Sequence, residues 1–186
     1  MFFTRRGDDG YTDLIGGSRV AKEELRIVAL GDIDEATSSI GLARASAQSD
    51  ETRAALLHVQ KDLYLLMADL ATVAGKAVSN PRLTEEHTAA LETIIQAFDQ
   101  RITIPKEFVA PGDSLPGATL DVARTVARRA ERTITHLLHT AAGATPAMAG
   151  YLNRLSSLLF GLARFEDGLA GVTSTISKTI KEPDKG

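Results

Sequence analysis

The sequence predicts an all-α protein, a five-helix up-down bundle with an irregular N-terminal loop. Four segments repeat apolar residues at alternating spacings of three and four, the period of one helix face, and a fifth repeats them less strongly. Such regular stripes are typical of helices that lie nearly antiparallel. The chain has 186 residues and no internal repeat, so we expect one domain with one core.

The first expected helix carries the weakest of the five stripes. Asp32 and Glu35 have the spacing of a capping-box variant. This spacing places the beginning of the helix at residue 32 or up to two turns earlier. The apolar positions of the stripe are Ile33, Ala36, Ile40, Ala43 and Ala47.

The four stronger stripes span residues 56–73, 91–102, 120–137 and 148–169. Thr84 precedes the second of them and is its expected N-cap, because a threonine hydroxyl can accept a hydrogen bond from the first turn. Glu85 and Glu86 follow, where the helix dipole favours negative charge. Each stripe therefore predicts a helix with one buried face.

The segments around the helices divide the chain into three parts. Residues 103–118 hold three prolines and two glycines, and a connection of this length in a compact domain is usually functional or disordered. The opening residues are rich in glycine, and the end is polar. We expect a nucleotide-binding N-terminal loop over 1–22, a helical bundle over 23–171 and a flexible tail over 172–186.

Composition and charge exclude several classes of protein. The formal net charge of −3 argues against a general binder of nucleic acid or of membrane surfaces. The chain has no cysteine, which excludes disulfides, thiolate catalysis and cysteine-ligated zinc. No apolar run approaches the ~20 residues of a membrane span, and no leader-like segment opens the chain. A cytoplasmic location is the expectation.

Arginines gather in the stripe 120–137. On a helix Arg124, Arg128, Glu131 and Thr135 share one face, and Arg132 lies above Arg128. Arginine suits bidentate recognition of phosphate. A solvated face with Glu–Arg pairs, an anionic ligand and an acidic neighbouring helix all remain open at this point.

Two further stretches carry candidate ligand contacts. The N-terminal segment combines glycines, which permit oxyanion-binding turns, with Arg5, Arg6, Arg19 and Lys22. It matches neither of the familiar phosphate-loop patterns, and a flexible arm is the alternative. In the last helix Asn153 is either a register device between helices or a ligand contact.

Several motifs in order resemble the PduO-type ATP:cob(I)alamin adenosyltransferases, or corrinoid adenosyltransferases. The resemblance covers nearly the whole chain. It rests on "TRRGDDGYT", "SRVAK", "GDIDEATSSIGLARA", "FVAPGDS", "VARTVARRAER" and "YLNRLSSLLFGLAR".

The resemblance implies a homotrimer with an ATP site at each subunit interface. The family transfers the 5′-deoxyadenosyl group of ATP to the cobalt of cob(I)alamin and releases triphosphate. Mg²⁺ is expected to accompany the ATP and to bridge phosphate oxygens, so no protein residues are assigned to a metal. A corrinoid reductase and a B12-dependent enzyme are the expected protein partners.

The family's functional residues carry over onto matching positions of this sequence. The resemblance implies ATP contacts at Thr4, Arg5, Arg6, Gly7, Thr12, Asp13, Lys22, Arg128, Arg129, Glu131, Arg132 and Asn153. Asp34 and Arg124 match a salt bridge between subunits beside the corrinoid. Phe108 matches the loop phenylalanine that displaces the lower axial ligand of cobalamin. We expect these three residues and Arg128 to serve catalysis.

The sequence departs from the family pattern at several positions. Arg6 stands where threonine is usual, Asp113 replaces the second glycine of Pro-Gly-Gly, and Asp121 stands where histidine is common. Ala36 and Thr37 replace leucine and asparagine. The loop changes concern the corrinoid side of the expected site more than the nucleotide side.

Three other functions are compatible with a helical bundle. An ATP-binding bundle without transferase activity, acting as a regulator or corrinoid carrier, is the main alternative. A ferritin-like metal bundle needs Glu-x-x-His pairs, and no histidine of this chain has a glutamate three residues before it. A structural oligomer would use its arginines only to pair with acidic residues of a neighbour.

Overall fold

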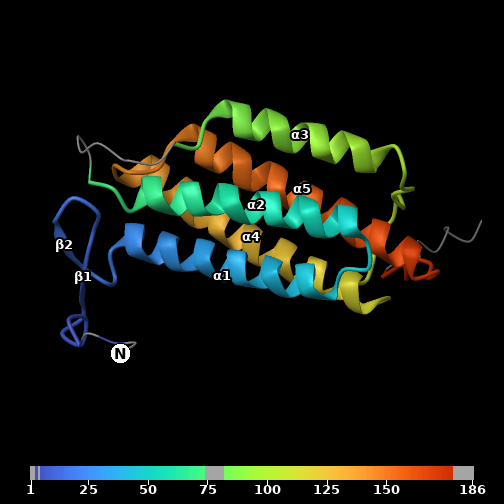
Figure 1. Ribbon diagram of the computed structural model, residues 1–186, viewed down its shortest axis with the longest axis horizontal. Helices are drawn as coiled ribbons and strands as arrows, with labels where there is room; N and C mark the ends of the chain where they lie inside the picture. Colours follow the sequence, from blue (N-terminus) through green and yellow to red (C-terminus); the bar gives the residue numbers. More distant parts are fainter. Residues whose placement is uncertain (1–2, 4, 74–81, 178–186) are drawn as a thin grey trace, which may run out of the picture.

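A computed structural model describes residues 3, 5–73 and 82–177 of the chain. Five helices lie side by side along the longest axis of the molecule (Figure 1). They are α1 (Leu25–Ser46), α2 (Asp50–Leu70), α3 (Glu85–Asp99), α4 (Leu115–Thr140) and α5 (Pro146–Leu169). A small antiparallel sheet of β1 (Tyr11–Asp13) and β2 (Arg19–Ala21) precedes them. The predicted five-helix, mainly α-helical architecture is confirmed.

The core follows the predicted stripes. Helix α5 packs against both α4 and α3, while α1 packs against α4 and α2. Leu155, Leu158 and Leu162 of α5 are buried among the other helices. Removing one such leucine side chain from water contributes about 1.5–3 kcal/mol, so burial of these faces is the main source of stability.

Side-chain caps define where most helices begin. Ser49 caps α2 and Thr145 caps α5, each through its side-chain oxygen. Thr84 caps α3 as predicted, in a capping box whose second partner is His87. Such a cap satisfies N–H groups that have no partner within the helix.

Helix α1 begins within the expected range but without the expected capping box. The helix begins at Leu25, two turns before residue 32, so Asp32 and Glu35 lie inside it. Both carboxylates point to α4 instead, where Arg129 pairs with them. The capping-box spacing was therefore misleading, because the same spacing also places two carboxylates on one helix face.

The N-terminal segment contains a hairpin that the sequence analysis did not predict. The turn between its strands is possible because Gly16 and Gly17 adopt positive φ values of 107° and 95°. The backbone N–H of Ile15 donates to the carbonyl of Ala71 at 2.9 Å. This contact joins the hairpin to the end of α2. The hairpin was not predicted because strands of three residues are too short to show a period of two.

The long connection before α4 is shorter than predicted. Ser114 is the N-cap of α4, and Pro116 and Gly117 belong to its first turn rather than to the loop, since proline is well tolerated there. Val109 of the connection forms an antiparallel bridge with Ile176. Residues 175–177 of the expected tail therefore lie against the long loop.

The described part of the chain contains neither a membrane-spanning helix nor a cluster of metal ligands. Within it, no helix is long and apolar enough to cross a membrane. The same residues contain no group of three or more histidine or acidic side chains placed to hold a metal ion.

Candidate functional site

The middle of α4 presents an exposed arginine whose side chain has no partner among the described residues. The guanidinium of Arg128 forms no hydrogen bond or ion pair with any described residue, and only its backbone carbonyl accepts a bond, from Arg132 Nη1 at 3.1 Å. Arg132 is also exposed. An uncompensated cationic surface of this kind favours an anionic ligand.

Arg129, the next residue on α4, is engaged within the chain. Its Nη2 pairs with a carboxylate oxygen of Glu35 on α1, and its Nε lies 3.5 Å from Asp32. The hydrogen bond to Glu35 raises the pKa of Arg129 above its ordinary value. Thr133 donates to the other oxygen of Asp32 at 2.5 Å. The two neighbouring arginines therefore have different surroundings.

Asn153 and Glu131 connect the two C-terminal helices. The side-chain amide of Asn153 donates to Glu131 Oε1 at 2.7 Å, and its oxygen accepts from Arg154 at 3.0 Å. Arg154 in turn donates to Glu92 of α3 at 2.7 Å. Asn153 is exposed and Glu131 is half-buried beside the core seam, and their hydrogen bond holds the two side chains together.

The cationic residues of the N-terminal segment are held by the segment itself. Lys22 Nζ donates to the carbonyl of Gly7 at 2.6 Å, and Arg6 pairs with Asp13 at 2.8 Å. Arg5 adopts a φ of 62°, unusual for a residue with a side chain. Thr12 lies in β1 opposite Val20. Thr4, also predicted to contact ATP, lies outside the described residues.

The corrinoid-side candidate Phe108 lies on the long loop and is 82% exposed. Its carbonyl accepts two hydrogen bonds from Ser177, from the backbone N–H at 2.8 Å and from the hydroxyl at 2.9 Å. Nearby, Asp113 accepts from the backbone N–H of Thr175 at 2.9 Å and from its hydroxyl at 2.5 Å. These two bonds hold the pKa of Asp113 below its ordinary value.

Arg124 and Asp34 do not meet within one chain. Arg124 Nε donates to Asp121 Oδ1 at 2.8 Å, one turn earlier on α4. Asp34 is exposed on α1 and has no hydrogen-bond or ion-pair partner among the described residues. The predicted pair is therefore absent inside the chain, and both of its members remain available to a neighbouring copy.

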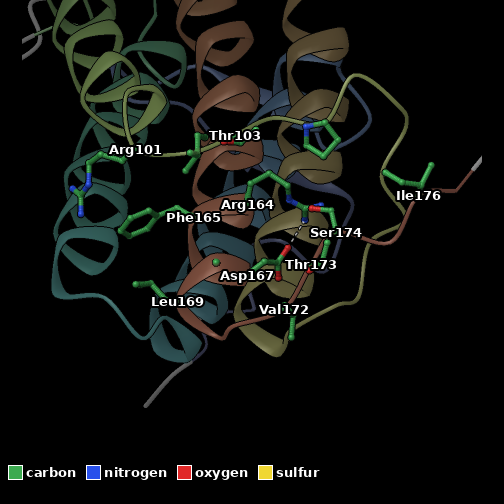
Figure 2. A pocket seen from close by; sticks show the side chains of 13 residues that line it. Arg101, Thr103, Arg164, Phe165, Asp167, Leu169, Val172, Thr173, Ser174 and Ile176 are labelled. Carbon is green, nitrogen blue, oxygen red and sulfur yellow. Dashed lines mark ion pairs between the residues drawn. The ribbon is translucent and has the colours of Figure 1, made fainter.

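A cavity of about 660 Å³ lies at the C-terminal end of α5 (Figure 2). Arg164 and Asp167 line it from α5 and form an ion pair at 3.0 Å. Arg164 Nη2 also bonds Asp121 Oδ2 at 2.8 Å. Thr173 and Ser174 of the C-terminal segment lie beside this pair in the same view. The charged side chains of Arg164 and Asp167 in the cavity wall therefore already pair with each other.

The candidate residues lie in three separate regions of one chain. The hairpin lies at the end where α1 begins, the connection after α3 lies at the opposite end, and the arginines lie between them on α4 (Figure 1). Asp121, Arg164 and Glu166 are charged yet buried, which was not predicted from the sequence. The available signal was a charged residue beside a core stripe position, such as Asp121 after Leu120.

The fold and these side chains define a class of protein: a five-helix bundle with a cationic helix face and a glycine-containing N-terminal hairpin. The chain belongs to the cobalamin adenosyltransferase family, whose model matches residues 2–166.

Curated relatives agree with this membership. The chain is 41% identical over 166 residues to a corrinoid adenosyltransferase of Citrobacter freundii, covering 89% of this chain and 94% of the relative. It is 43% identical over 169 residues to a corrinoid adenosyltransferase of Mycobacterium leprae (strain TN), covering 87% and 88%.

Solved structures also match the fold. One is a variant of the PduO-type ATP:corrinoid adenosyltransferase from Lactobacillus reuteri complexed with cobalamin and ATP, with a TM-score of 0.85, 28% identity and coverage of 96% of this chain and 100% of that chain. Another variant of that enzyme, complexed with ATP, has a TM-score of 0.83, 29% identity and coverage of 95% and 100%.

Proposed function

We propose that this protein transfers the 5′-deoxyadenosyl group of ATP to the cobalt of cob(I)alamin, giving adenosylcobalamin and triphosphate. In this reaction the electron pair of cobalt(I) forms the bond to C5′. The C5′–O bond breaks, and triphosphate leaves with its bonding pair, so that cobalt becomes formally cobalt(III). The nucleophile belongs to the substrate, and the protein supplies position and charge. The absence of cysteine from the chain is compatible with this division of roles.

The guanidinium of Arg128 has no partner in the described part of the chain, and this observation is the main support for the nucleotide site. Arg128 and Arg132 bind the triphosphate, and Arg129 joins them when it exchanges Glu35 for phosphate oxygens. Glu131 and Asn153 hold each other at 2.7 Å beside this surface and contact the nucleoside part. Mg²⁺ bridges phosphate oxygens with few protein ligands.

The complete site requires a second copy of the chain, in an up-down bundle that assembles as a homotrimer. In support, the N-terminal hairpin lies at one end of the bundle, away from the middle of α4 in its own chain (Figure 1). In the trimer the N-terminal segment of one protomer closes over α4 of another. Residues Arg5, Arg6, Gly7, Thr12, Asp13 and Lys22, together with Thr4, then reach the phosphates.

The corrinoid lies next to Phe108, with Asp34 and Arg124 pairing across the same subunit boundary. Two observations support this arrangement: Phe108 is exposed, and the carboxylate of Asp34 has no partner among the residues that the structure describes. Phe108 displaces the lower axial ligand, which makes cobalt(II) easier to reduce. A corrinoid reductase then delivers the cobalt(I) form, a B12-dependent enzyme takes the product, and the reaction takes place in the cytoplasm.

A spectral assay tests the proposal. The purified protein is mixed with MgATP and chemically reduced cobalamin, and the light-sensitive alkyl-cobalt spectrum of adenosylcobalamin is expected. Tight ATP binding without that spectrum would instead support a regulator or corrinoid carrier. Absence of both would contradict the nucleotide site as well.

A further inference from the structure

Asp121 is a buried carboxylate that serves two arginines. It lies in the second turn of α4 with only 4% of its surface exposed. Its Oδ1 accepts from Arg124 Nε at 2.8 Å, and its Oδ2 accepts from Arg164 Nη2 of α5 at 2.8 Å. Each oxygen therefore has its own guanidinium, from different helices.

The charges around Asp121 are balanced. Arg164 is itself buried and also pairs with Asp167 at 3.0 Å. Asp167 accepts a further bond from Ser114, the N-cap of α4, at 2.6 Å. A buried carboxylate is tolerated only when it is paired and hydrogen-bonded. This cluster therefore holds Asp121 in one place on the bundle.

A fixed Asp121 restricts the orientation of Arg124. A guanidinium has two edges that can meet a carboxylate. In Arg124 the Nε atom already donates to Asp121. Nη1 and Nη2 form no hydrogen bond or ion pair with any described residue, and the side chain is 25% exposed. The outer edge of Arg124 consequently points away from the cluster and stays available.

From this geometry we infer that Asp121 is a positioning residue for adenosyl transfer. It holds Arg124 so that the outer guanidinium edge meets Asp34 of a neighbouring protomer beside the corrinoid. This role rests on the proposed function and acts entirely through Arg124. A neutral histidine at this position would have one acceptor nitrogen and could bind only one of the two arginines. The aspartate binds both.

The test compares Asp121→Asn and Asp121→Ala with the control Asp62→Asn. Asp62 is likewise buried and accepts from Tyr151 at 2.9 Å, but it has no contact with Arg124. We expect kcat for adenosylcobalamin formation to fall about tenfold or more in the Asp121 variants, since small misplacements of a positioned group are costly. The Kd for ATP stays unchanged, and Asp62→Asn keeps the wild-type kcat.

A double-mutant cycle separates positioning from general destabilisation. If Asp121 acts through Arg124, the variant carrying both Asp121→Ala and Arg124→Ala is no slower than Arg124→Ala alone. Additive losses, or a wild-type kcat in Asp121→Asn, would overturn the inference. Wild-type protein that makes no adenosylcobalamin would contradict the proposed function instead.

Arg124→Lys provides a test that leaves the buried pair of Asp121 and Arg164 intact. Lysine keeps a positive charge that can reach Asp34, but its single ammonium group cannot bind Asp34 and Asp121 through two separate edges as a guanidinium does. We expect a fall in kcat similar to that of Asp121→Asn, with circular dichroism and oligomeric state unchanged. A lysine variant with the wild-type kcat would show that charge alone suffices, and the positioning role of Asp121 would be wrong.

Discussion

Arg129 of α4 and Glu35 of α1 form an ion pair inside one chain, whereas the adjacent Arg128 has no partner among the described residues. The two side chains leave the helix about 100° apart, so one faces α1 and the other faces away from it. We therefore expect Arg128 to contribute directly to nucleotide binding and Arg129 to contribute only after it exchanges partners.

Arg128→Ala tests the first of these roles. Charged hydrogen bonds contribute about 1.5–3 kcal/mol, so ATP affinity should fall about tenfold to a hundredfold. The substitution is at an exposed position and should change stability by less than about 0.5 kcal/mol. Isothermal titration calorimetry measures the ATP affinity, urea unfolding measures the stability, and light scattering measures the oligomeric state. Arg53→Ala, at an exposed pair with Asp50 on α2, is the control.

A dissociated oligomer with unchanged ATP affinity in Arg128→Ala would contradict the enzyme site. It would support the structural account instead, in which these arginines only pair with acidic residues of a neighbouring subunit.

Glu35→Gln tests the second role. Exposed ion pairs contribute only about 0–1 kcal/mol to stability, so the melting temperature should change little. If Arg129 must leave Glu35 to reach phosphate, the variant should bind ATP more tightly, by up to about fivefold from the same energy. A loss of ATP affinity would show that Glu35 helps to hold Arg129 in its binding position.

Phe108→Ala is expected to separate binding from turnover. Phe108 is 82% exposed, so removing its ring leaves the core intact, and the bonds from Ser177 to its backbone carbonyl do not need the side chain. Adenosylcobalamin formation that starts from cob(II)alamin and a reductant should slow at least tenfold, in the range that misplaced groups produce, while the Kd for ATP stays constant. Unchanged turnover would remove Phe108 from the proposed corrinoid site.

Glu166→Gln is expected to destabilise the bundle without affecting ATP binding. Glu166 is 0% exposed, and its two oxygens accept from the backbone N–H groups of Gln48 and Ser49 at 2.8 and 3.2 Å. Glutamine keeps one acceptor and turns an N–H group toward the other donor. A buried donor without a partner costs about 1–3 kcal/mol, measurable by urea unfolding. Glu51→Gln, at an exposed pair with Arg101, should cost less than 1 kcal/mol.

The sequence predicted the helices because their cores depend on local periodicity. Every apolar position of the stripe from Leu120 to Leu137 is buried, including Ala123 and Ile134. The cap at Thr84 was also recognisable, because a cap and the helix it begins are neighbours in the chain. Local patterns of this kind need no knowledge of which helices become neighbours.

The buried charges could not be predicted in this way. Asp121 and Arg164 are 43 residues apart, and their pairing depends on how α4 and α5 pack. The spacing of Asp32 and Glu35 matched a cap and also a pair of carboxylates facing another helix, and only the fold distinguishes the two. The hairpin depends on a contact between Ile15 and the end of α2, which strands of three residues do not reveal.

The contact between Asp113 and Thr175 leads to a pH-dependent prediction. Two hydrogen bonds from Thr175 stabilise the charged carboxylate and hold the pKa of Asp113 below its ordinary value of about 3.9. A group whose pKa is lowered on folding contributes stability that is fully present above the unfolded pKa and is lost as pH falls through the folded pKa. The contact should therefore persist unchanged at neutral pH and disappear only in acid below about pH 4.

Nuclear magnetic resonance measures this directly, through the carboxyl shift of Asp113 and the amide shift of Thr175 between pH 7 and 2. Both signals should change together, at a midpoint below that of an unfolded aspartate. Asp113→Asn keeps one acceptor oxygen but no charge, so the amide shift of Thr175 should lose its pH dependence. Loss of the Asp113 contact should loosen residues 175–177 without unfolding the bundle. The bridge between Val109 and Ile176 still joins the same two segments. A midpoint at or above the ordinary value would mean that Thr175 does not bind the carboxylate in solution, and that the long loop carrying Phe108 is held by its backbone bonds alone.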